Sequence, residues 1–368
     1  MFLASNGQIW IVTHDSKLAS FDTINSKLTF HSLYQFEALN NEGAELIEIN
    51  GLDIKGETLY LFTKNRILMI NEQRFSLIKE VVVPIAENDN LIRIAVTDAG
   101  EIWASSFHGS GPMLFDGTDW QFFTHDKKDK TTISAELVLK IFEDSQKRVW
   151  FGTYSGLDLY LPESKQFKRY PPRDLNAEEN KNLGIIGNLV SGITEDDQGN
   201  LWLSVYHGGV FKFEPENEKF HHYQSVKDVK STNISNAMTL HPGVIFMDRQ
   251  QTLWSQTQKG ISRLTKGNRD LTQWVNIERN KCLPNAIHEG EQAIFFGCDN
   301  ALYELKNGEI NYVADFNKDI YSIVKGKKND IWVGTNGDGL YRYDLETFEV
   351  QRYAFDSNEY SLLNVNMV

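Results

Sequence analysis

The sequence has few cysteines and prolines and no long apolar run. Its two cysteines, Cys282 and Cys298, are too few for a disulfide framework or a thiolate metal site. They can pair if the domain lies outside the cytoplasm, and otherwise each is interpreted as a small buried hydrophobe. No stretch approaches the roughly eighteen apolar residues of a transmembrane helix. The first residues, MFLASNGQIW, lack the basic and apolar regions of a signal peptide. We therefore expect no direct membrane insertion by this segment and no signal peptide within it.

Positively charged residues are fewer than negatively charged ones. The chain of 368 residues has 37 Lys and Arg against 50 Asp and Glu, a formal net charge of −13. Binding to nucleic acid requires clustered Lys and Arg, so we expect no nucleic-acid partner, and an anionic membrane surface is disfavoured for the same reason. The short basic run at residues 127–130 is interrupted by an acid and is interpreted as a solvated loop.

Aromatic residues are abundant, at 12% of the chain, and they recur in a repeated segment. The clearest copy, residues 329–353, reads NDIWVGTNGDGLYRYDLETFEVQRY, with similar copies at 147–170, 199–223, 7–30 and 100–123 and weaker ones at 251–264, 293–305 and 56–70. The aromatic anchors of these copies are Trp10, Tyr60, Trp103, Trp150, Trp202, Trp254, Phe295 and Trp332. Anchors 37 to 52 residues apart are typical of propeller blades and too widely spaced for leucine-rich or ankyrin repeats.

Each copy predicts four β-strands, which we name A, B, C and D. Strand A is an apolar run such as 137–142, strand B carries the anchor, strand C follows a glycine-containing turn, and strand D ends in an aromatic residue. Alternation with a period of two between Gly, Asn and Asp residues is the signature of strands and hairpins. We therefore predict an all-β fold, a single β-propeller of four-stranded antiparallel blades over residues 1–368. Eight blades is the simplest count, and seven blades plus one stray repeat is the alternative.

The position of the anchors predicts how the blades pack. A four-stranded sheet has two apolar faces, and stacking sheets side by side buries both. We expect the Trp residues to fill the space between neighbouring blades, the alternative being a platform on which a ligand stacks. At the chain ends, Met1 aligns with Ile193 in strand A, and residues 366–368 align with residues 188–190. Either the first sheet is shared between the two ends of the chain, or the chain is a segment of a longer repeat array.

The repeat resembles that of a known family. Its pattern is Asp-x-x-Gly-x-Ile/Leu-Trp-x-Gly-Thr, then Gly-Leu-Tyr-Arg-Tyr-Asp, then Phe-x-x-Tyr and Ser-Leu-x-Asn, best matched at 330–335, 339–344, Phe348, Tyr353 and 361–362. This resembles the two-component regulator propeller repeat over nearly the whole chain. The resemblance implies the periplasmic sensor region of a membrane-bound histidine kinase, hybrid kinase-regulator or diguanylate cyclase, with carbohydrates or their breakdown products as frequent ligands.

The same resemblance implies partners. They are a small-molecule ligand such as an oligosaccharide, and a further propeller or an immunoglobulin-like domain of the same receptor, with a homodimer as a further option. The 368 residues contain no kinase, receiver, cyclase or DNA-binding segment. We therefore expect this segment to be a non-catalytic sensor without a cofactor, whose output belongs to other parts of the receptor.

The candidate ligand site follows from strand order. The D-to-A connections and B-to-C turns of a propeller share one end of the blades, and four D-to-A connections are long, at about 34–45, 124–136, 171–188 and 224–243. Long loops on a rigid scaffold commonly bind ligands. Aromatic, amide and acidic residues of the B-to-C turns suit a sugar, although each is also an ordinary exposed turn residue. The predicted ligand-binding residues are His14, Phe107, His108, Tyr154, Tyr206, His207, Gln258, Asn336 and Asp338.

Two other functions remain open. A lyase or hydrolase resembling streptogramin lyase would act through a His and a bound metal, with His108 and His207 as candidates, and a pure interaction scaffold is the other. The segment 195–200 superficially suggests a calcium loop but lacks its alternating ligands, so we interpret it as a hairpin turn and expect no metal there. His221 and His222 lie far in sequence from any matched carboxylate.

Overall fold

The structure is a computed structural model, and it describes only part of the chain. The described residues are 2–3, 8–12, 18–22, 27–33, 36, 49–86, 88–108, 110–170, 189–205, 209–223, 245–257, 260–264, 272–273, 284–290, 293–307, 309–326, 329–336 and 338–353. Within these ranges the secondary structure is β-strand and turn, with no α-helix. Correspondingly, none of the described residues forms a helix long and apolar enough to cross a membrane.

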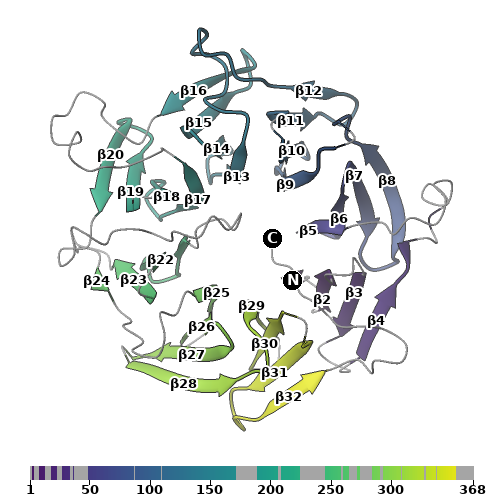
Figure 1. The fold of residues 1–368 in the computed structure, drawn as a ribbon, viewed down its shortest axis with the longest axis vertical. Helices are drawn as coiled ribbons and strands as arrows, with labels where there is room; N and C mark the ends of the chain where they lie inside the picture. Colours follow the sequence, from purple (N-terminus) through teal and green to yellow (C-terminus); the bar gives the residue numbers. More distant parts are fainter. Residues whose placement is uncertain are drawn as a thin grey trace. The chain divides into compact units, whose positions relative to one another are not determined.

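The strands form eight four-stranded antiparallel sheets (Figure 1). In each sheet the strands pair in chain order, so they correspond to the predicted strands A to D. The prediction of an all-β propeller with eight blades is confirmed. The alternative of seven blades plus a stray repeat is wrong, because the weak copies around Tyr60, Trp254 and Phe295 each complete a sheet of four strands. We number the sheets blade 1 to blade 8 in chain order.

The contacts of the chain divide the blades into two compact units. Unit 1 contains residues 1–91 and 284–368, and unit 2 contains residues 92–283. The strands of unit 1 are β1 (Phe2–Leu3), β2 (Gln8–Val12), β3 (Leu18–Asp22) and β4 (Lys27–His31) in blade 1; β5 (Ile49–Lys55), β6 (Thr58–Thr63), β7 (Arg66–Asn71) and β8 (Ser76–Val82) in blade 2; β25 (Pro284–Glu289), β26 (Ile294–Cys298), β27 (Ala301–Lys306) and β28 (Glu309–Asp315) in blade 7; and β29 (Ile320–Lys325), β30 (Asp330–Thr335), β31 (Leu340–Asp344) and β32 (Val350–Tyr353) in blade 8.

The remaining four blades, blades 3 to 6, make up unit 2. Leu91, the first residue of blade 3, is the one residue of these strands that falls in unit 1. The strands are β9 (Leu91–Val96), β10 (Ile102–Ser106), β11 (Pro112–Phe115) and β12 (Trp120–Phe122) in blade 3; β13 (Val138–Glu143), β14 (Val149–Thr153), β15 (Gly156–Leu161) and β16 (Gln166–Tyr170) in blade 4; β17 (Val190–Glu195), β18 (Leu201–Val205), β19 (Gly209–Glu214) and β20 (Lys219–Tyr223) in blade 5; and β21 (Ile245–Met247), β22 (Leu253–Thr257), β23 (Gly260–Leu264) and β24 (Thr272–Gln273) in blade 6.

The strand B tryptophans lie between neighbouring blades, as predicted. In unit 2, Trp103 of blade 3 is fully buried and packs edge-on against Phe151 of blade 4, with ring centroids 4.8 Å apart. Trp150 of blade 4 packs in the same way on Phe213 of blade 5, at 5.7 Å. An aromatic side chain contributes a large buried area, so truncating one of these tryptophans to Ala should lower stability by about 3–5 kcal/mol.

In unit 1 the same contact joins the last blade to the first. Trp332 of blade 8 lies 4.5 Å from Phe21 of blade 1, and both side chains are fully buried. Leu340 and Ile9 belong to the same cluster. The first sheet takes all four strands from residues 2–31, with Phe2 opposite Trp10 in the β1–β2 ladder. Strand A of blade 1 is therefore supplied by the N-terminal residues, while residues 366–368 lie outside the described residues.

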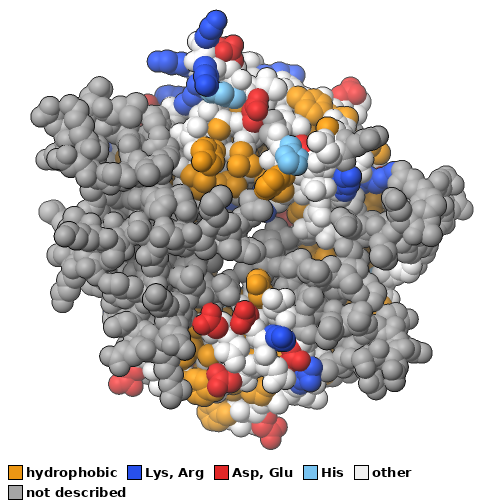
Figure 2. All heavy atoms as spheres, viewed as in Figure 1, with side chains coloured by type: hydrophobic (Ala, Val, Ile, Leu, Met, Phe, Trp, Pro, Cys, Tyr) orange, Lys and Arg blue, Asp and Glu red, His pale blue; other side chains and the backbone are white. Residues whose placement is uncertain are grey.

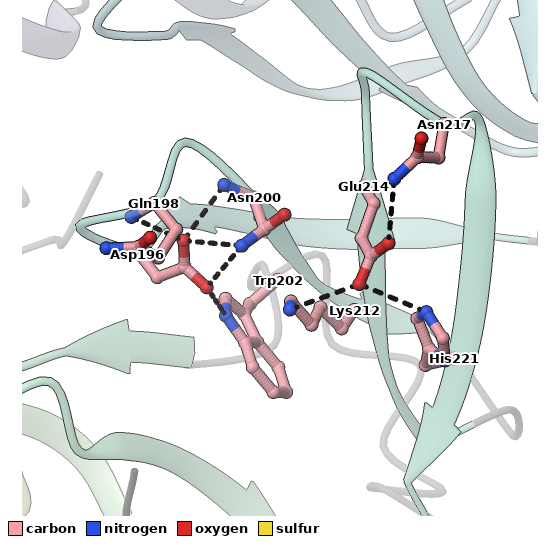
Figure 3. Close-up of polar contacts among 8 residues, drawn as sticks. All are labelled: Asp196, Gln198, Asn200, Trp202, Lys212, Glu214, Asn217 and His221. Carbon is pink, nitrogen blue, oxygen red and sulfur yellow. Dashed lines mark hydrogen bonds and ion pairs between the residues drawn. The ribbon is translucent and has the colours of Figure 1, made fainter. Parts of the chain in front are cut away.

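The A-to-B turns contain a hydrogen-bonded Asp that sequence reasoning missed. In Figure 3, Asp196 accepts hydrogen bonds from Gln198 N, Asn200 N and Trp202 Nε1, at 3.0, 2.9 and 2.9 Å. Asp144 and Asp248 bind Trp150 Nε1 and Trp254 Nε1 in the same way, at 2.7 and 2.8 Å. One carboxylate thus caps the turn and provides an acceptor for the buried indole N–H. The predicted hairpin-turn role of residues 195–200 is confirmed.

Three other tryptophans lack this acceptor. The residue six positions before the Trp is Asp in blades 4, 5 and 6, but it is Ala4, Thr97 or Gly326 in blades 1, 3 and 8. Accordingly, Nε1 of Trp10, Trp103 and Trp332 is buried without a hydrogen-bond acceptor in the part of the chain that the structure describes. A buried donor without a partner is costly, so these indoles are identified as local weak points.

Candidate functional site

The D-to-A connections and B-to-C turns lie at one end of the blades, which we call the loop end. In blade 4, Tyr154 N of the B-to-C turn donates to Leu137 O at the end of the D-to-A connection, at 3.1 Å. In blade 8, Asn336 N donates to Asp319 O in the same arrangement, at 2.8 Å. Within each unit the predicted sharing of one end is therefore confirmed.

Five of the predicted ligand-binding residues can be located. Phe107, His108 and Tyr154 lie at the loop end of unit 2, and Asn336 and Asp338 at that of unit 1. The other predicted residues lie outside the described residues: His14, Tyr206, His207 and Gln258. Of the two candidates for the His of the lyase alternative, His108 is described and His207 is not.

Exposed aromatic side chains mark the loop end of unit 2. Tyr154 is 56% exposed and Phe107 is 41% exposed, which is high for residues of their size. His108 packs edge-on against Phe107 with ring centroids 5.2 Å apart. Figure 2 shows hydrophobic side chains gathered on this face together with His side chains. Flat, exposed rings of this kind provide a surface on which the apolar face of a sugar can stack, with hydroxyl and imidazole groups at hand.

The blade 4 connection, residues 124–137, is held against its own blade by Arg169 of β16. Arg169 Nε donates to Thr132 O at 2.6 Å, and Nη2 donates to Asp129 O at 2.7 Å and to Asp126 O at 3.1 Å. His125 Nδ1 lies 2.8 Å from Ile133 O inside the same connection. One guanidinium group therefore joins several turns of the loop, and the loop end of blade 4 is preformed.

A buried acid anchors the second half of this connection. Asp158 of β15 is fully buried and accepts hydrogen bonds from Ser134 N, at 3.2 Å, and from Ser134 Oγ. Ser134 Oγ also lies 2.7 Å from Thr153 Oγ1 in strand B. Burial raises the pKa of Asp158 to about 7, although the hydrogen bonds from Ser134 and the charge of Arg169 oppose the shift.

The loop end of unit 1 contains Asp338, one of the predicted ligand-binding residues. Asp338 is tied to its surroundings, because it accepts hydrogen bonds from Asn317 Nδ2 at 3.0 Å, from Tyr341 OH and from Arg352. Burial and the Asp338 carboxylate raise the pKa of Tyr341 to about 12. Figure 2 shows Asp and Glu side chains on this face of unit 1. Asp338 therefore has a structural role that its position in the sequence did not predict.

Two further acids lie on this face. Asp299 and Asp319 are exposed turn residues of blades 7 and 8. Burial and the charge of Asp319 raise the pKa of Asp299. The part of the chain that the structure describes contains no group of three or more His, Cys, Asp or Glu side chains placed to hold a metal ion.

One histidine contact was not anticipated from the sequence. The β19–β20 hairpin brings His221 to Glu214, with His221 Nε2 3.1 Å from Glu214 Oε1 (Figure 3). Lys212 Nζ lies 3.3 Å from the same oxygen. Hydrogen bonds from Asn217 and Lys212 lower the pKa of Glu214 against the opposing effect of burial. The cluster belongs to the C-to-D hairpin, at the opposite end of the blade from the loop end.

Two segments of the chain resemble a known family of propeller repeats. The family model for the two-component regulator propeller matches residues 132–155 and 315–337, which are the segments leading through strands A and B of blades 4 and 8. Two segments of the chain therefore match the two-component regulator propeller repeat. The matched segments contain Ser134 and Thr153, so the anchoring of the blade 4 connection lies within the part of the repeat that the family model recognises.

Relatives place this propeller among larger proteins. It is 28% identical over 86 residues to histidine kinase P4 of Formosa agariphila, a match that covers 23% of this chain and 6% of that protein. The extracellular domain of a putative hybrid two-component system from B. thetaiotaomicron matches 99% of this chain at 16% identity and a TM-score of 0.51, with 47% of that domain covered. The chain thus spans less than half of either protein.

A third similarity concerns the fold alone. Dihydro-heme d1 dehydrogenase in complex with DHE matches 99% of this chain and 75% of its own length, with a TM-score of 0.66 and 9% identity. At this level of identity the match supports the propeller architecture and gives no information on activity.

Proposed function

We propose that this two-component regulator propeller is the extracytoplasmic, periplasmic ligand-sensing region of a bacterial signal-transduction receptor, that it is not itself an enzyme, and that it binds a carbohydrate at the loop end of unit 2. The observation that carries the proposal is the exposed Tyr154 ring beside a preformed connection. The family relationship supports the sensing role. A further propeller or an immunoglobulin-like domain of the same receptor would adjoin this segment, with a homodimer as a further option.

The state of the cysteines supports the location. Cys298 of β26 is disulfide-bonded, and the sequence has one other cysteine, Cys282, which lies outside the described residues. Disulfides form and persist in oxidising compartments such as the bacterial periplasm. An extracytoplasmic position agrees with this chemistry.

A thermal-shift screen against oligosaccharides tests the proposal. A ligand that binds only the folded protein stabilises it by about 2.7 kcal/mol at a free concentration of about 100 Kd, which is readily measured as a rise in Tm. Tyr154→Ala should abolish that rise. Tyr312→Ala is the matched control, because Tyr312 is 54% exposed on the outer strand β28, away from the loop ends.

The control variant should keep the full response to the ligand. A chain that no oligosaccharide stabilises, or a Tyr154→Ala variant that responds like the control, contradicts the proposal. Release of a shortened or unsaturated product from any stabilising oligosaccharide would show turnover and contradict the non-catalytic assignment.

A further inference from the structure

The tip of the blade 4 connection displays three lysines in an otherwise acidic protein. Lys127, Lys128 and Lys130 are all exposed, and none of their side-chain ammonium groups has an ion-pair or hydrogen-bond partner among the residues that the structure describes. Figure 2 shows Lys and Arg side chains projecting from this region of unit 2. We call these residues the lysine tip. With a net charge of −13 for the chain, it is a local exception to the charge of the molecule.

The acids of the same loop build its turns and keep their negative charges, so the three lysines exceed the two aspartates of the loop by one positive charge. Asp126 Oδ1 accepts a hydrogen bond from Lys128 N at 2.8 Å. Asp129 Oδ1 accepts hydrogen bonds from Thr131 Oγ1 at 2.6 Å and from Thr131 N at 2.8 Å. These bonds, with the charge of Arg169, lower the pKa of Asp129. Both carboxylates face backbone donors.

Arg169 adds a fourth positive charge beneath the tip. Within the connection it donates hydrogen bonds to the carbonyl oxygens of Asp126, Asp129 and Thr132 and to the hydroxyl of Thr132. Carbonyl groups satisfy its donors without cancelling its charge. Two acids interact with its charge, namely Asp129 of the connection and Asp158, which is fully buried. Arg169 therefore adds to the excess of positive charge beneath the tip.

The tip is also preorganised. Phe167 N donates to Thr131 O at 2.7 Å, which fixes the loop to β16 in addition to the Arg169 contacts. A loop that is ordered before binding loses little conformational entropy when a ligand arrives, so more of the contact energy appears as affinity.

The lysine tip and the exposed Tyr154 ring belong to one connected structure. The lysine tip lies near the start of the blade 4 connection. Leu137, the last residue of that connection, accepts the hydrogen bond from Tyr154 N. We infer that the ligand of this propeller is an anionic oligosaccharide, whose ring stacks on Tyr154 and whose carboxylate or sulfate groups are bound by Lys127, Lys128 and Lys130. This inference rests on the proposed function.

Binding to defined probes tests the inference on the whole 368-residue chain. The probes are oligogalacturonate, which carries carboxylates, sulfated dextran oligosaccharides, and unsulfated dextran and neutral galactan of matched length. At least one charged probe should bind at least about tenfold more tightly than its neutral counterpart, and its Kd should rise with salt. Replacing the lysine tip, Lys127→Gln with Lys128→Gln and Lys130→Gln, should weaken that binding at least about tenfold.

The control has the same change in net charge. It replaces three exposed lysines at C-to-D turns by Gln, namely Lys165, Lys219 and Lys306. Equal weakening in both triple variants, or charged and neutral probes that bind equally, overturns the inference. Neutral glycans that bind in a Tyr154-dependent way while charged ones do not would leave the proposed sensor function standing and remove only the anionic ligand. Polyglutamate that binds as tightly as the charged sugars would show a general polyanion site and contradict the carbohydrate assignment.

Discussion

Substituting Thr97 by Asp should stabilise the protein. In blades 4, 5 and 6 an Asp six residues before the strand B Trp binds the indole N–H. In blade 3 this position is Thr97, and Nε1 of the fully buried Trp103 has no acceptor in the described part of the chain. Thr97→Asp would supply the missing acceptor.

The backbone of blade 3 is already arranged for this change. Thr97 N donates to Glu101 O at 3.0 Å, and Gly100 N donates to Thr97 O at 2.9 Å. The corresponding bonds of Asp196 in blade 5 measure 2.9 and 3.0 Å. Because the two turns match, an Asp at position 97 would hold its carboxylate where Asp196 holds its own.

The expected magnitude follows from opposing effects. A buried unsatisfied donor costs about 1–3 kcal/mol, and a hydrogen bond to a charged group contributes about 1.5–3 kcal/mol. Against this stand the desolvation of a new carboxylate and its repulsion by Glu101, whose pKa is already raised by burial and by the charges of Glu143 and Asp116. We expect a net gain of about 1 kcal/mol in the free energy of unfolding, which raises the Tm by about 1–3 °C.

Thermal and urea unfolding of four variants measure this gain. Thr97→Asp is compared with the natural chain, and the same pair is compared in a Trp103→Phe background, which has no indole N–H. The gain should disappear in that background. Asp196→Asn, the reverse change in blade 5, should lower stability. The reasoning is refuted if Thr97→Asp destabilises the protein, or if its effect is the same with Phe at position 103.

Two further predictions concern buried groups. The raised pKa of Asp158 means that ionisation of this side chain destabilises the folded state. The destabilisation is absent below the unfolded pKa of 3.8 and grows as the pH rises to about 7. Measured by urea unfolding, the free energy of unfolding of Asp158→Asn should therefore rise by about 2–3 kcal/mol relative to that of the natural chain as the pH increases from ~5 to ~8. A difference between the two chains that does not change with pH would contradict the burial of a titrating acid. For Cys298, a thiol assay on the denatured chain should detect no free thiol before reduction and two after it, and Cys298→Ser should lower stability by about 3 kcal/mol if a loop of about 15 residues is opened. A free thiol in the unreduced chain would show that the disulfide does not form.

The sequence was sufficient for the fold because the propeller signal is local and repeated. Even the anchors that are not tryptophan, Tyr60 and Phe295, lie buried in strand B as predicted. The Asp that binds each indole was present as a fixed spacing, six residues before Trp150, Trp202 and Trp254. It was interpreted only as a turn residue, because the spacing does not reveal that the carboxylate turns inward.

The candidate site was harder to predict. The exposure of Tyr154 follows from its place in a B-to-C turn, but the contacts of Arg169 depend on how a long connection folds back on the blade after it. The position of Asp158 is unusual in the sequence alone, because the equivalent strand C position is occupied by Tyr341 and Phe211 in other blades. A polar residue at a buried aromatic position indicates a special environment, but not which loop it anchors.

Hydrogen–deuterium exchange with a stabilising oligosaccharide bound tests the central claim most directly. The account predicts slower exchange at the loop end of unit 2, in peptides covering residues 124–137 and 150–156, with the outer strand β28 unchanged. Protection confined to other blades, or to the C-to-D hairpins, would contradict a sensor site at this loop end.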